Sequence, residues 1–426
     1  MIKDILVDIG FGETRVAILE DGEPVEIYIE ATGYEKLAGN IYRGKVERIL
    51  PGMQSAFVDI GTGKNAFLYA DDIIKSRDLD LAQTAKIENL VSQGQEITVQ
   101  VFKEALDNKG SRVSTNIKLP GRRVILTPLM PGIGVSKKIK SPDEKERLRR
   151  IAENLCPEGM GIIVRTAAEG THSEEMESDI EGLLKLWRGI TGREEKGSVP
   201  RCIYEEPGVI YKLVRDHIDL DLHRFIINDR VEYEKLLEHL DAVSSVLKLK
   251  VEYFCRDYDM FKYYHIDTAI SKALARKVWL KSGGYLVFDR TEALTVIDVN
   301  TGKYVGKNTQ EETILKTNEE AALTVAKQIR LRNISGIILI DFIDMKGTSH
   351  KERLIAVLRE AVKSDSSKVV VVGMTGLGLV ELTRKKVRGT LQQLLTVPCP
   401  TCGGLGRVPI NSINSKQWNK MTDNFR

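Results

Sequence analysis

The chain has 426 residues, of which 42% are hydrophobic and 29% charged, a composition typical of a globular protein with several domains. No apolar run reaches the roughly 18 residues that a membrane-spanning helix needs. Acids also interrupt the N-terminal stretch MIKDILVDIG, so the sequence argues against a membrane protein and a secretory signal and favours the cytoplasm. The net charge of +3 is too small to indicate a polyanionic partner by itself, although Lys and Arg cluster locally.

The N-terminal part of the chain predicts β structure. Residues 1–35 alternate apolar and polar positions around an Asp-Gly turn, which is typical of a β-hairpin. Between residues 39 and 118, about five short strand patterns are separated by turns that contain Gly. This spacing favours a small β-barrel.

The middle of the chain mixes helices and short strands. A capping box at Ser141 begins a helix at 145–155, and a strand at 161–167 and a helix at 173–190 follow. Further along, we expect strands at 208–216 and 224–229 and helices at 232–243 and 267–280.

From residue 282 onward the pattern becomes regular. It predicts a β-hairpin at 284–299, helices at 308–334, 351–365 and 380–395, and strands at 336–343 and 368–374. Such alternation indicates an α/β layer whose sites lie beyond the carboxyl ends of the strands.

Two acids follow apolar strands in this region. Asp298 and Asn300 are two residues apart on one predicted strand, so their side chains share a face. Asp341 ends the next strand, and the helical crossover between the two strands makes them neighbours. Two carboxylates at adjacent strand ends repel each other unless a cation such as Mg²⁺ lies between them. The pattern therefore predicts a metal site, in which Asn300 orients a carboxylate or a water.

A structural role fits the same acids equally well, because acids also cap strand ends or pair with Lys and Arg. The pattern alone leaves both interpretations open. Asp344 follows Asp341 by three residues and would face the other way on a regular strand, behind the metal ligands.

The predicted barrel indicates a class of substrate. Small barrels of this kind bind single-stranded nucleic acid by stacking bases on aromatic rings, while basic side chains follow the backbone. Phe57 and Phe67 bracket the turn GTGK. Positive charge comes from Lys45, Arg48, Lys109 and Arg112. A Phe on a strand is more often part of the core, so both roles stay open for each ring.

Arg165 and Thr166 end a predicted strand shortly before a helix start. A guanidinium and a hydroxyl in such a position can bind a phosphate. An Arg-Thr pair alone is more often a solvated edge, so the motif is weak evidence.

Cys399 and Cys402 form the most specific short motif. Two thiols separated by two residues and followed by glycines match half of a tetrahedral zinc site. The other cysteines, Cys156, Cys202 and Cys255, stand alone, so a second copy of the chain would have to supply the other half. A free or redox-active dithiol is the alternative.

Six stretches follow one another along the chain: GNIYRGKV, MQSAFVDIG, IIVRTA, SGGYLVFDRTEALTVIDVNTGK, RLRNISGIILIDFIDM and CPTCGGLG. In these motifs and their order the chain resembles the bacterial ribonuclease E/G family, from residue 1 to about residue 410. The lack of a long disordered tail is more typical of the ribonuclease G branch of that family.

The resemblance implies a multidomain α/β fold. It predicts an S1-type OB β-barrel inserted in a ribonuclease H-like subdomain, followed by a 5′-sensor, a deoxyribonuclease I-like α/β catalytic subdomain and a C-terminal zinc link. The expected bounds are 1–35 and 215–280 for the ribonuclease H-like parts, 36–118 for the barrel, 119–214 for the sensor, 281–398 for the catalytic subdomain, and 399–426 for the zinc link and tail.

The resemblance also implies a function: an endoribonuclease that cuts single-stranded RNA in the processing and decay of rRNA and mRNA. It places Mg²⁺ on Asp298 and Asp341 with Asn300 assisting, and it assigns the reading of a 5′-monophosphate to Arg165 and Thr166.

The remaining implied roles concern RNA contacts and assembly. Phe57 and Phe67 would contact RNA, with Lys109 or Arg112 nearby. Cys399 and Cys402 would share zinc between two protomers, giving a homodimer. The family's tetramer is in doubt here, because the chain stops soon after the cysteines.

Two rival hypotheses remain. The first is a non-catalytic RNA-binding or assembly factor that uses the same barrel. The second is a chaperone-like zinc module, which would need four paired cysteines in one chain.

Overall fold

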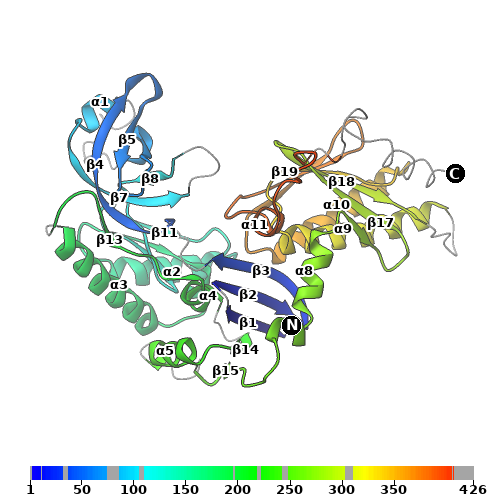
Figure 1. Cartoon of the computed structure of the whole chain (residues 1–426), viewed down its shortest axis with the longest axis horizontal. Coiled ribbons are helices and arrows are strands. Elements are labelled where there is room, and N and C mark those ends of the chain that lie inside the picture. The colour runs from blue at the N-terminus through cyan, green and yellow to red at the C-terminus, as the bar shows by residue number, and fades with distance from the viewer. Residues whose placement is uncertain are drawn as a thin grey trace. The chain divides into compact units, whose positions relative to one another are not determined.

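The computed structural model describes residues 2–10, 12–31, 37–73, 86–104, 110–194, 197–217, 222–241, 248–302, 310–404 and 406 (Figure 1). The chain divides into two compact units. We call residues Thr32–Leu222 the barrel unit, and Met1–Ala31 together with His223–Arg426 the two-sheet unit. No helix in the described ranges is both long and apolar enough to span a membrane.

The barrel unit contains a closed β-barrel among its described residues. The strand order is β4-β5-β6-β8-β7, and β7 pairs again with β4, which closes the ring; β13 adds to the outer side of β4. The strands are β4 (Ile41–Leu50), β5 (Ser55–Asp59), β6 (Ala66–Tyr69), β7 (Glu96–Lys103), β8 (Arg112–Ser114) and β13 (Arg201–Tyr204). The predicted five-stranded barrel is confirmed, and it is consistent with an OB-fold.

A second sheet of the barrel unit is covered by helices. Its strands, in spatial order, are β11 (Gly132–Val135), β12 (Gly161–Val164), β10 (Val124–Thr127) and β9 (Leu119–Pro120). The helices of the unit are α1 (Ile87–Leu90), α2 (Pro142–Leu155), α3 (Ser173–Glu194) and α4 (Val209–His217). The predicted cap of α2 is present, because Ser141 Oγ accepts a hydrogen bond from the backbone N–H of Glu144 at 3.3 Å.

Helix α4 corrects one prediction, since residues 208–216 were expected to form a strand. Its buried residues are Val209, Ile210, Leu213 and Val214. This spacing of three and four puts them on one side of a helix, whereas a strand would divide them between two faces.

The first sheet of the two-sheet unit combines strands from before and after the barrel unit in the sequence. Its strands, in spatial order, are β15 (Val251–Tyr253), β14 (Leu222–Ile227), β1 (Lys3–Gly10), β2 (Glu13–Glu20) and β3 (Glu23–Ala31). Asp21 and Gly22 both have positive φ at the turn between β2 and β3, as the predicted Asp-Gly hairpin requires. The helices near this sheet are α5 (Arg230–Asp241), α7 (Met260–Tyr263) and α8 (Ile266–Leu274).

The second sheet of the same unit carries the predicted acids. Its strands, in spatial order, are β16 (Lys277–Trp279), β17 (Tyr285–Arg290), β18 (Leu294–Asn300), β19 (Gly336–Asp341), β21 (Val380–Arg384) and β20 (Val369–Met374). Helix α9 (Gln310–Leu331) crosses from β18 to β19, and α10 (Thr348–Ala361) and α11 (Leu391–Leu395) follow. One face of the sheet packs on α9 and α10 in a single hydrophobic core.

Two further helix predictions are wrong in this unit. Residues 380–395 form strand β21 and the short helix α11. In β21, Val380, Leu382 and Arg384 are buried and alternate with the half-buried Glu381 and the exposed Thr383, which is the period of a strand. The helix expected at 267–280 ends at Leu274, and Lys277–Trp279 becomes the edge strand β16.

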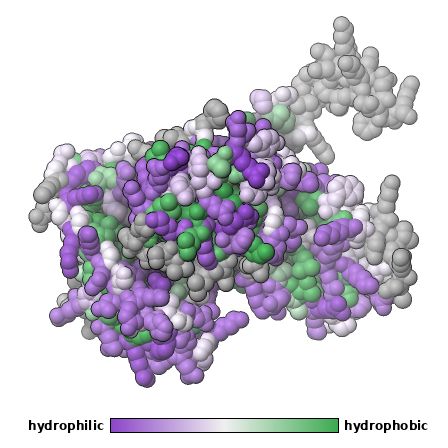
Figure 2. All heavy atoms as spheres, turned by 90° about the horizontal axis from the view of Figure 1, so that it is seen from below, coloured by the Kyte–Doolittle hydropathy of each residue, from purple (hydrophilic) through white to green (hydrophobic). Residues whose placement is uncertain are grey.

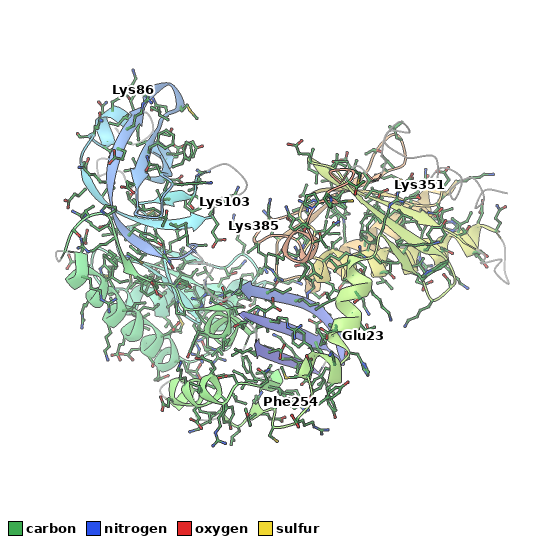
Figure 3. The ribbon with its side chains drawn as sticks, in the orientation of Figure 1. Glu23, Lys86, Lys103, Phe254, Lys351 and Lys385 are labelled. Carbon is green, nitrogen blue, oxygen red and sulfur yellow. The ribbon has the colours of Figure 1, made fainter. Side chains whose placement is uncertain are left out.

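Helix α9 also fastens the two sheets of this unit to each other. The buried Arg330 lies 2.8 Å from both Glu20 Oε1 and Glu26 Oε1 on the first sheet. At the surface, Lys327 Nζ lies 2.8 Å from Oε2 of Glu23, which is labelled in Figure 3. The sheet with the acids therefore packs on a helix that these ion pairs connect to the first sheet.

The face of the molecule seen in Figure 2 is mostly hydrophilic, with scattered hydrophobic patches.

Candidate active site

The carboxyl ends of β18 and β19 bring Asp298 and Asp341 side by side. The two residues are Cα partners in the parallel ladder, and both side chains are exposed. The preceding pair, Ile297 and Ile340, is fully buried on α9 and α10. Because successive side chains alternate between faces, both acids lie on the open face of the sheet.

Asn300 lies on the same face and contacts one of the acids. Its Nδ2 donates a hydrogen bond to Asp298 Oδ2 at 2.8 Å. In the described part of the chain, no Lys, Arg or His forms an ion pair with Asp298 or Asp341. The interpretation in which these acids pair with basic side chains therefore finds no support among those residues.

Asp344 does not take the position expected from a regular strand. Strand β19 ends at Asp341, so the alternation of faces does not extend to Asp344, whose side chain is exposed.

The donor set decides which metal the site could hold. Within the described residues, no group of three or more His, Cys, Asp or Glu side chains gathers in one place. Mg²⁺ is commonly bound by one or two carboxylates and keeps several waters, whereas zinc sites use more nitrogen and sulfur ligands. The exposed pair of Asp298 and Asp341 fits Mg²⁺.

An arginine and two phenylalanines lie in one row across the barrel, and a second arginine completes it. Arg48 is the Cα partner of Phe57, Phe57 of Phe67, and Phe67 of Arg112. The two rings are 4.6 Å apart between centroids and half-buried. Their neighbours Ala56, Val58, Ala66 and Leu68 fill the barrel core. The rings therefore lie on the outer surface, with Arg48 and Arg112 at the two ends of the row.

The structure adds two aromatic residues to this surface that the sequence analysis missed. The Tyr69 ring lies 6.4 Å from that of Phe67, and Arg112 Cζ lies 4.5 Å from the Tyr69 ring and 5.1 Å from the Phe102 ring. The position of Tyr69, two residues after Phe67 on one strand, was the available signal. No comparable signal marked Phe102.

One of the positive charges on this surface is paired with an acid. Arg112 Nη2 lies 2.8 Å from Asp72 Oδ2, which fixes the guanidinium beside the rings. Lys103, labelled in Figure 3, is the Cα partner of Arg112 and is exposed. Lys109 lies outside the described residues.

Strand β12 ends at Val164, earlier than the predicted strand at 161–167, and Arg165 and Thr166 follow it directly, with Thr166 beginning a 3₁₀ helix at Thr166–Ala168. Arg165 Nη1 donates to the carbonyl oxygen of Gly121 at 2.6 Å, and Thr166 Oγ1 lies 3.1 Å from Ser136 Oγ. Thr166 is exposed and the Arg165 side chain is 26% exposed, so both can meet a ligand from solvent.

The partner that orients Arg165 was not found from the sequence. Arg165 Nη2 lies 2.8 Å from Oδ1 of Asp216, on α4, and Arg215 Nε lies 3.2 Å from the same oxygen. Burial alone would raise the pKa of Asp216, but the two guanidinium groups outweigh it and hold the pKa below its usual value of 3.8. Asp216 therefore stays ionised and holds Arg165 in place.

Cys399 and Cys402 follow helix α11. Cys399 is exposed, and the backbone N–H of Gly406 donates to Cys402 Sγ at 3.3 Å. Hydrogen bonds from the backbone N–H groups of Cys402 and Thr401 to the Cys399 sulfur, together with the Cys402 thiol, lower the pKa of Cys399. The two cysteines form a turn whose first thiol ionises easily.

The fold is a multidomain mixed α/β architecture with a closed five-stranded barrel consistent with an OB-fold. The model of the Ribonuclease E/G family matches residues 118–387. The chain is 41% identical to ribonuclease G of Escherichia coli strain K12 over 414 residues, which is 96% of this chain and 85% of the relative. This chain belongs to the ribonuclease E/G family and is an endoribonuclease.

Other relatives support the same assignment. Ribonuclease G of Haemophilus influenzae is 42% identical over 95% of this chain and 84% of its own length. Ribonuclease E of a Nostoc species is 37% identical over 92% of this chain but only 57% of its own length. The similarity therefore extends over nearly the whole chain in both branches of the family.

Proposed function

We propose that this chain is a Mg²⁺-dependent endoribonuclease that cuts single-stranded RNA, with a preference for a 5′-monophosphate end, in the processing and decay of rRNA and mRNA. One observation carries the catalytic part of the proposal. Asp298 and Asp341 are partners on adjacent parallel strands, exposed on the open face of the sheet, with Asn300 hydrogen-bonded to Asp298.

The acids would act by holding and orienting Mg²⁺. Bound there, Mg²⁺ would supply an activated water and stabilise the charge that develops on the phosphodiester oxygens. Asp298 would be fixed in orientation by the Asn300 amide, which donates to one of its oxygens and leaves the other available. Asp341 has the matching position on the next strand, so the two carboxylates would lie side by side and could bind one ion.

The barrel supports RNA as the substrate. The row of Arg48, Phe57, Phe67 and Arg112 places two half-buried rings on the outer surface of the barrel beside two arginines. Bases of a single strand would stack on the rings while the guanidinium groups neutralise phosphates, which requires no particular sequence.

The neighbouring side chains of Arg165 and Thr166 support recognition of a terminal phosphate. Arg165 offers a guanidinium whose orientation is set by Gly121 and Asp216, and Thr166 offers a hydroxyl beside Ser136. A phosphate monoester has enough acceptor oxygens to engage both groups, whereas a 5′-hydroxyl end does not.

Cys399 and Cys402 would contribute to assembly. Zinc binds thiolates in tetrahedral sites, and the lowered pKa of Cys399 favours the thiolate. Two thiolates from each of two chains would complete one site and give a homodimer.

Replacing the acids tests the catalytic proposal. We expect Asp298→Asn and Asp341→Asn each to slow cleavage of a single-stranded oligoribonucleotide by about 100-fold or more while RNA affinity stays within a few-fold. Glu292→Gln is the matched control, because Glu292 is an exposed acid at the turn between β17 and β18. Unchanged cleavage in both Asn variants would contradict the assignment and favour a non-catalytic RNA-binding factor.

The substrate arms of the same experiment test the RNA end. Matched oligoribonucleotides with a 5′-monophosphate or a 5′-triphosphate are cleaved with and without Mg²⁺. Equal rates on both RNAs would remove the role of Arg165 and Thr166, and cleavage without a divalent ion would remove that of Mg²⁺.

A further inference from the structure

The edge strand β16 exposes an aromatic cluster that no proposed role uses. Trp279 is 65% exposed, and its ring lies edge-on to that of Tyr285 with the centroids 5.4 Å apart. Lys277 lies over both rings, with its Nζ 4.0 Å from the Trp279 centroid and 3.4 Å from the Tyr285 centroid. We call Lys277, Trp279 and Tyr285 the edge platform.

The edge platform is not part of the core. Val278, between Lys277 and Trp279, packs against the hydrophobic core on the other face of the sheet. The next strand behaves in the same way, because Leu286 is fully buried whereas Tyr285 is only half-buried. Lys277, Trp279 and Tyr285 therefore share the open face.

The strand register connects the edge platform to the proposed active site. Trp279 is the Cα partner of Tyr285, which is the partner of Asn300. One row further along, Lys277 faces Val287, Val287 faces Asp298, and Asp298 faces Asp341. Since neighbouring strands lie about 5 Å apart, the Trp279 backbone is roughly 10 Å from that of Asn300. The platform and the acids belong to one continuous surface.

The chemistry of this surface indicates its ligand. A large exposed ring beside a second ring offers a flat apolar face, and every nucleobase can stack on such a face. The ammonium group of Lys277 favours a negatively charged ligand and polarises the rings. An apolar protein partner would gain less binding energy from the charge of Lys277. Asp298 and Asp341 lie a short distance away, where the RNA backbone would pass.

We propose that Trp279 stacks on a base of the RNA next to the scissile phosphodiester, with Tyr285 packed edge-on beside it, and that Lys277 neutralises an adjacent phosphate. This inference rests on the proposed function, because it places the scissile phosphodiester at Asp298 and Asp341. The platform would make cleavage depend on the presence of a base at one position beside the cut, and would fix the register of the strand over the acids.

A cycle of protein and RNA changes tests the platform. Oligoribonucleotides with a single abasic nucleotide at successive positions around the cleavage site are bound to the wild type and to Trp279→Ala, with the divalent ion chelated. We expect Trp279→Ala to weaken binding of intact RNA by about 5- to 100-fold. At one abasic position the wild type should lose as much, and the variant should lose nothing more.

Two variants separate stacking from structural damage. Trp279→Phe keeps a ring and should restore most of the affinity, and Tyr258→Ala, which removes an aromatic side chain that is 59% exposed elsewhere in this unit, should have no effect. A fluorescent base analogue, 2-aminopurine, placed at the sensitive position should be quenched by the wild type and not by Trp279→Ala.

The outcomes distinguish a failure of the platform proposal from a failure of the proposed function. If Asp298→Asn abolishes cleavage but losses from Trp279→Ala and from every abasic position add, the platform proposal is wrong and the proposed function stands. If Asp298→Asn and Asp341→Asn cleave normally, the proposed function fails, and a non-additive cycle would then show only that the platform binds a base. Unchanged affinity in Trp279→Ala with a new loss of self-association would assign the platform to a second copy of the chain.

Discussion

Arg165 and Asp216 form an ion pair that joins the residue after β12 to α4, with 2.8 Å between Nη2 and Oδ1. The other terminal nitrogen of Arg165 donates to the carbonyl oxygen of Gly121 at 2.6 Å. A planar guanidinium held at two points has one orientation, so its remaining N–H groups point in a fixed direction. The proposed binding of a phosphate should therefore depend on the shape of the cation as well as on its charge.

Arg165→Lys tests that dependence on shape. Lysine keeps the charge, but its single nitrogen cannot contact Gly121 and Asp216 and also present a fork to a phosphate. We expect the preference for 5′-monophosphate over 5′-hydroxyl RNA to fall by about 10- to 100-fold, with the rate on 5′-hydroxyl RNA unchanged. The measurement is the ratio of kcat/KM values on the two RNAs. A ratio equal to that of the wild type would show that charge alone matters.

The pH dependence of the same preference follows from the lowered pKa of Asp216. A carboxyl whose pKa lies below 3.8 in the folded state remains ionised above that value, and its ion pair is lost only as the pH falls below it. The Arg165–Asp216 pair is therefore constant between pH 5 and pH 8. A terminal phosphate monoester gains its second negative charge at about pH 6. The preference for 5′-monophosphate RNA should therefore rise between pH 5 and pH 8. A preference that is flat from pH 5 to pH 8 would contradict a role for the dianion.

Asn300→Ala tests how Asp298 is oriented. Losing the 2.8 Å hydrogen bond frees the carboxylate to rotate, and the loss of such a supporting contact typically lowers metal affinity or activity by about 10- to 100-fold. We expect the Mg²⁺ concentration for half-maximal cleavage to rise by a similar factor. RNA affinity in the absence of Mg²⁺ should not change, and a change there would assign Asn300 to RNA binding instead.

Neighbouring residues on β6 allow binding and folding to be separated. Phe67 is half-buried on the outer surface of the barrel, whereas Leu68 is fully buried in its core. Phe67→Ala should weaken RNA binding by about 5- to 100-fold with little change in thermal stability. Leu68→Ala should lower the free energy of unfolding by about 2–5 kcal/mol. Fluorescence anisotropy and thermal denaturation of both variants provide the check, and equal losses of stability would contradict the assignment of Phe67 to the surface.

The paired acids illustrate what the sequence could predict. The apolar runs before Asp298 and Asp341 and the helix between them were enough to place the two strands in parallel, because such a crossover determines which strands become neighbours. Asp216 illustrates the limit. It contacts Arg165 from a helix far along the chain, and no periodic pattern relates the two residues.

The helices and strands that were predicted wrongly have a common physical cause. Residues 380–395 contain apolar positions that fit a helix and a strand equally well, and pairing with β19 and β20 decided in favour of the strand. The faces of the barrel strands were undecided for the same reason. Ala56 and Val58 entered the core and left the larger Phe57 outside, an arrangement that hydrophobicity alone does not predict.

Cys399 should be the cysteine that reacts first when compared with Cys156. Hydrogen bonds from the backbone N–H groups of Cys402 and Thr401 lower the pKa of Cys399 below its usual value of 9.0, whereas burial raises that of Cys156. At pH 7.5 more of Cys399 is therefore thiolate, and the thiolate is the form that attacks iodoacetamide and binds zinc. Mass spectrometry of the alkylated peptides over time gives the two rates.

Zinc extends this experiment to the proposed homodimer. Zn²⁺ should protect Cys399 and Cys402 from alkylation and leave Cys156 unaffected, because only the first two thiols have two residues between them, in a turn where Cys399 is exposed and Cys402 half-buried. Light scattering should show a dimer that dissociates in Cys399→Ser and in Cys402→Ser. If zinc protects neither thiol, or if both Ser variants remain dimeric, the shared zinc site is wrong, and the two cysteines are then a reactive dithiol in which the lowered pKa of Cys399 favours oxidation.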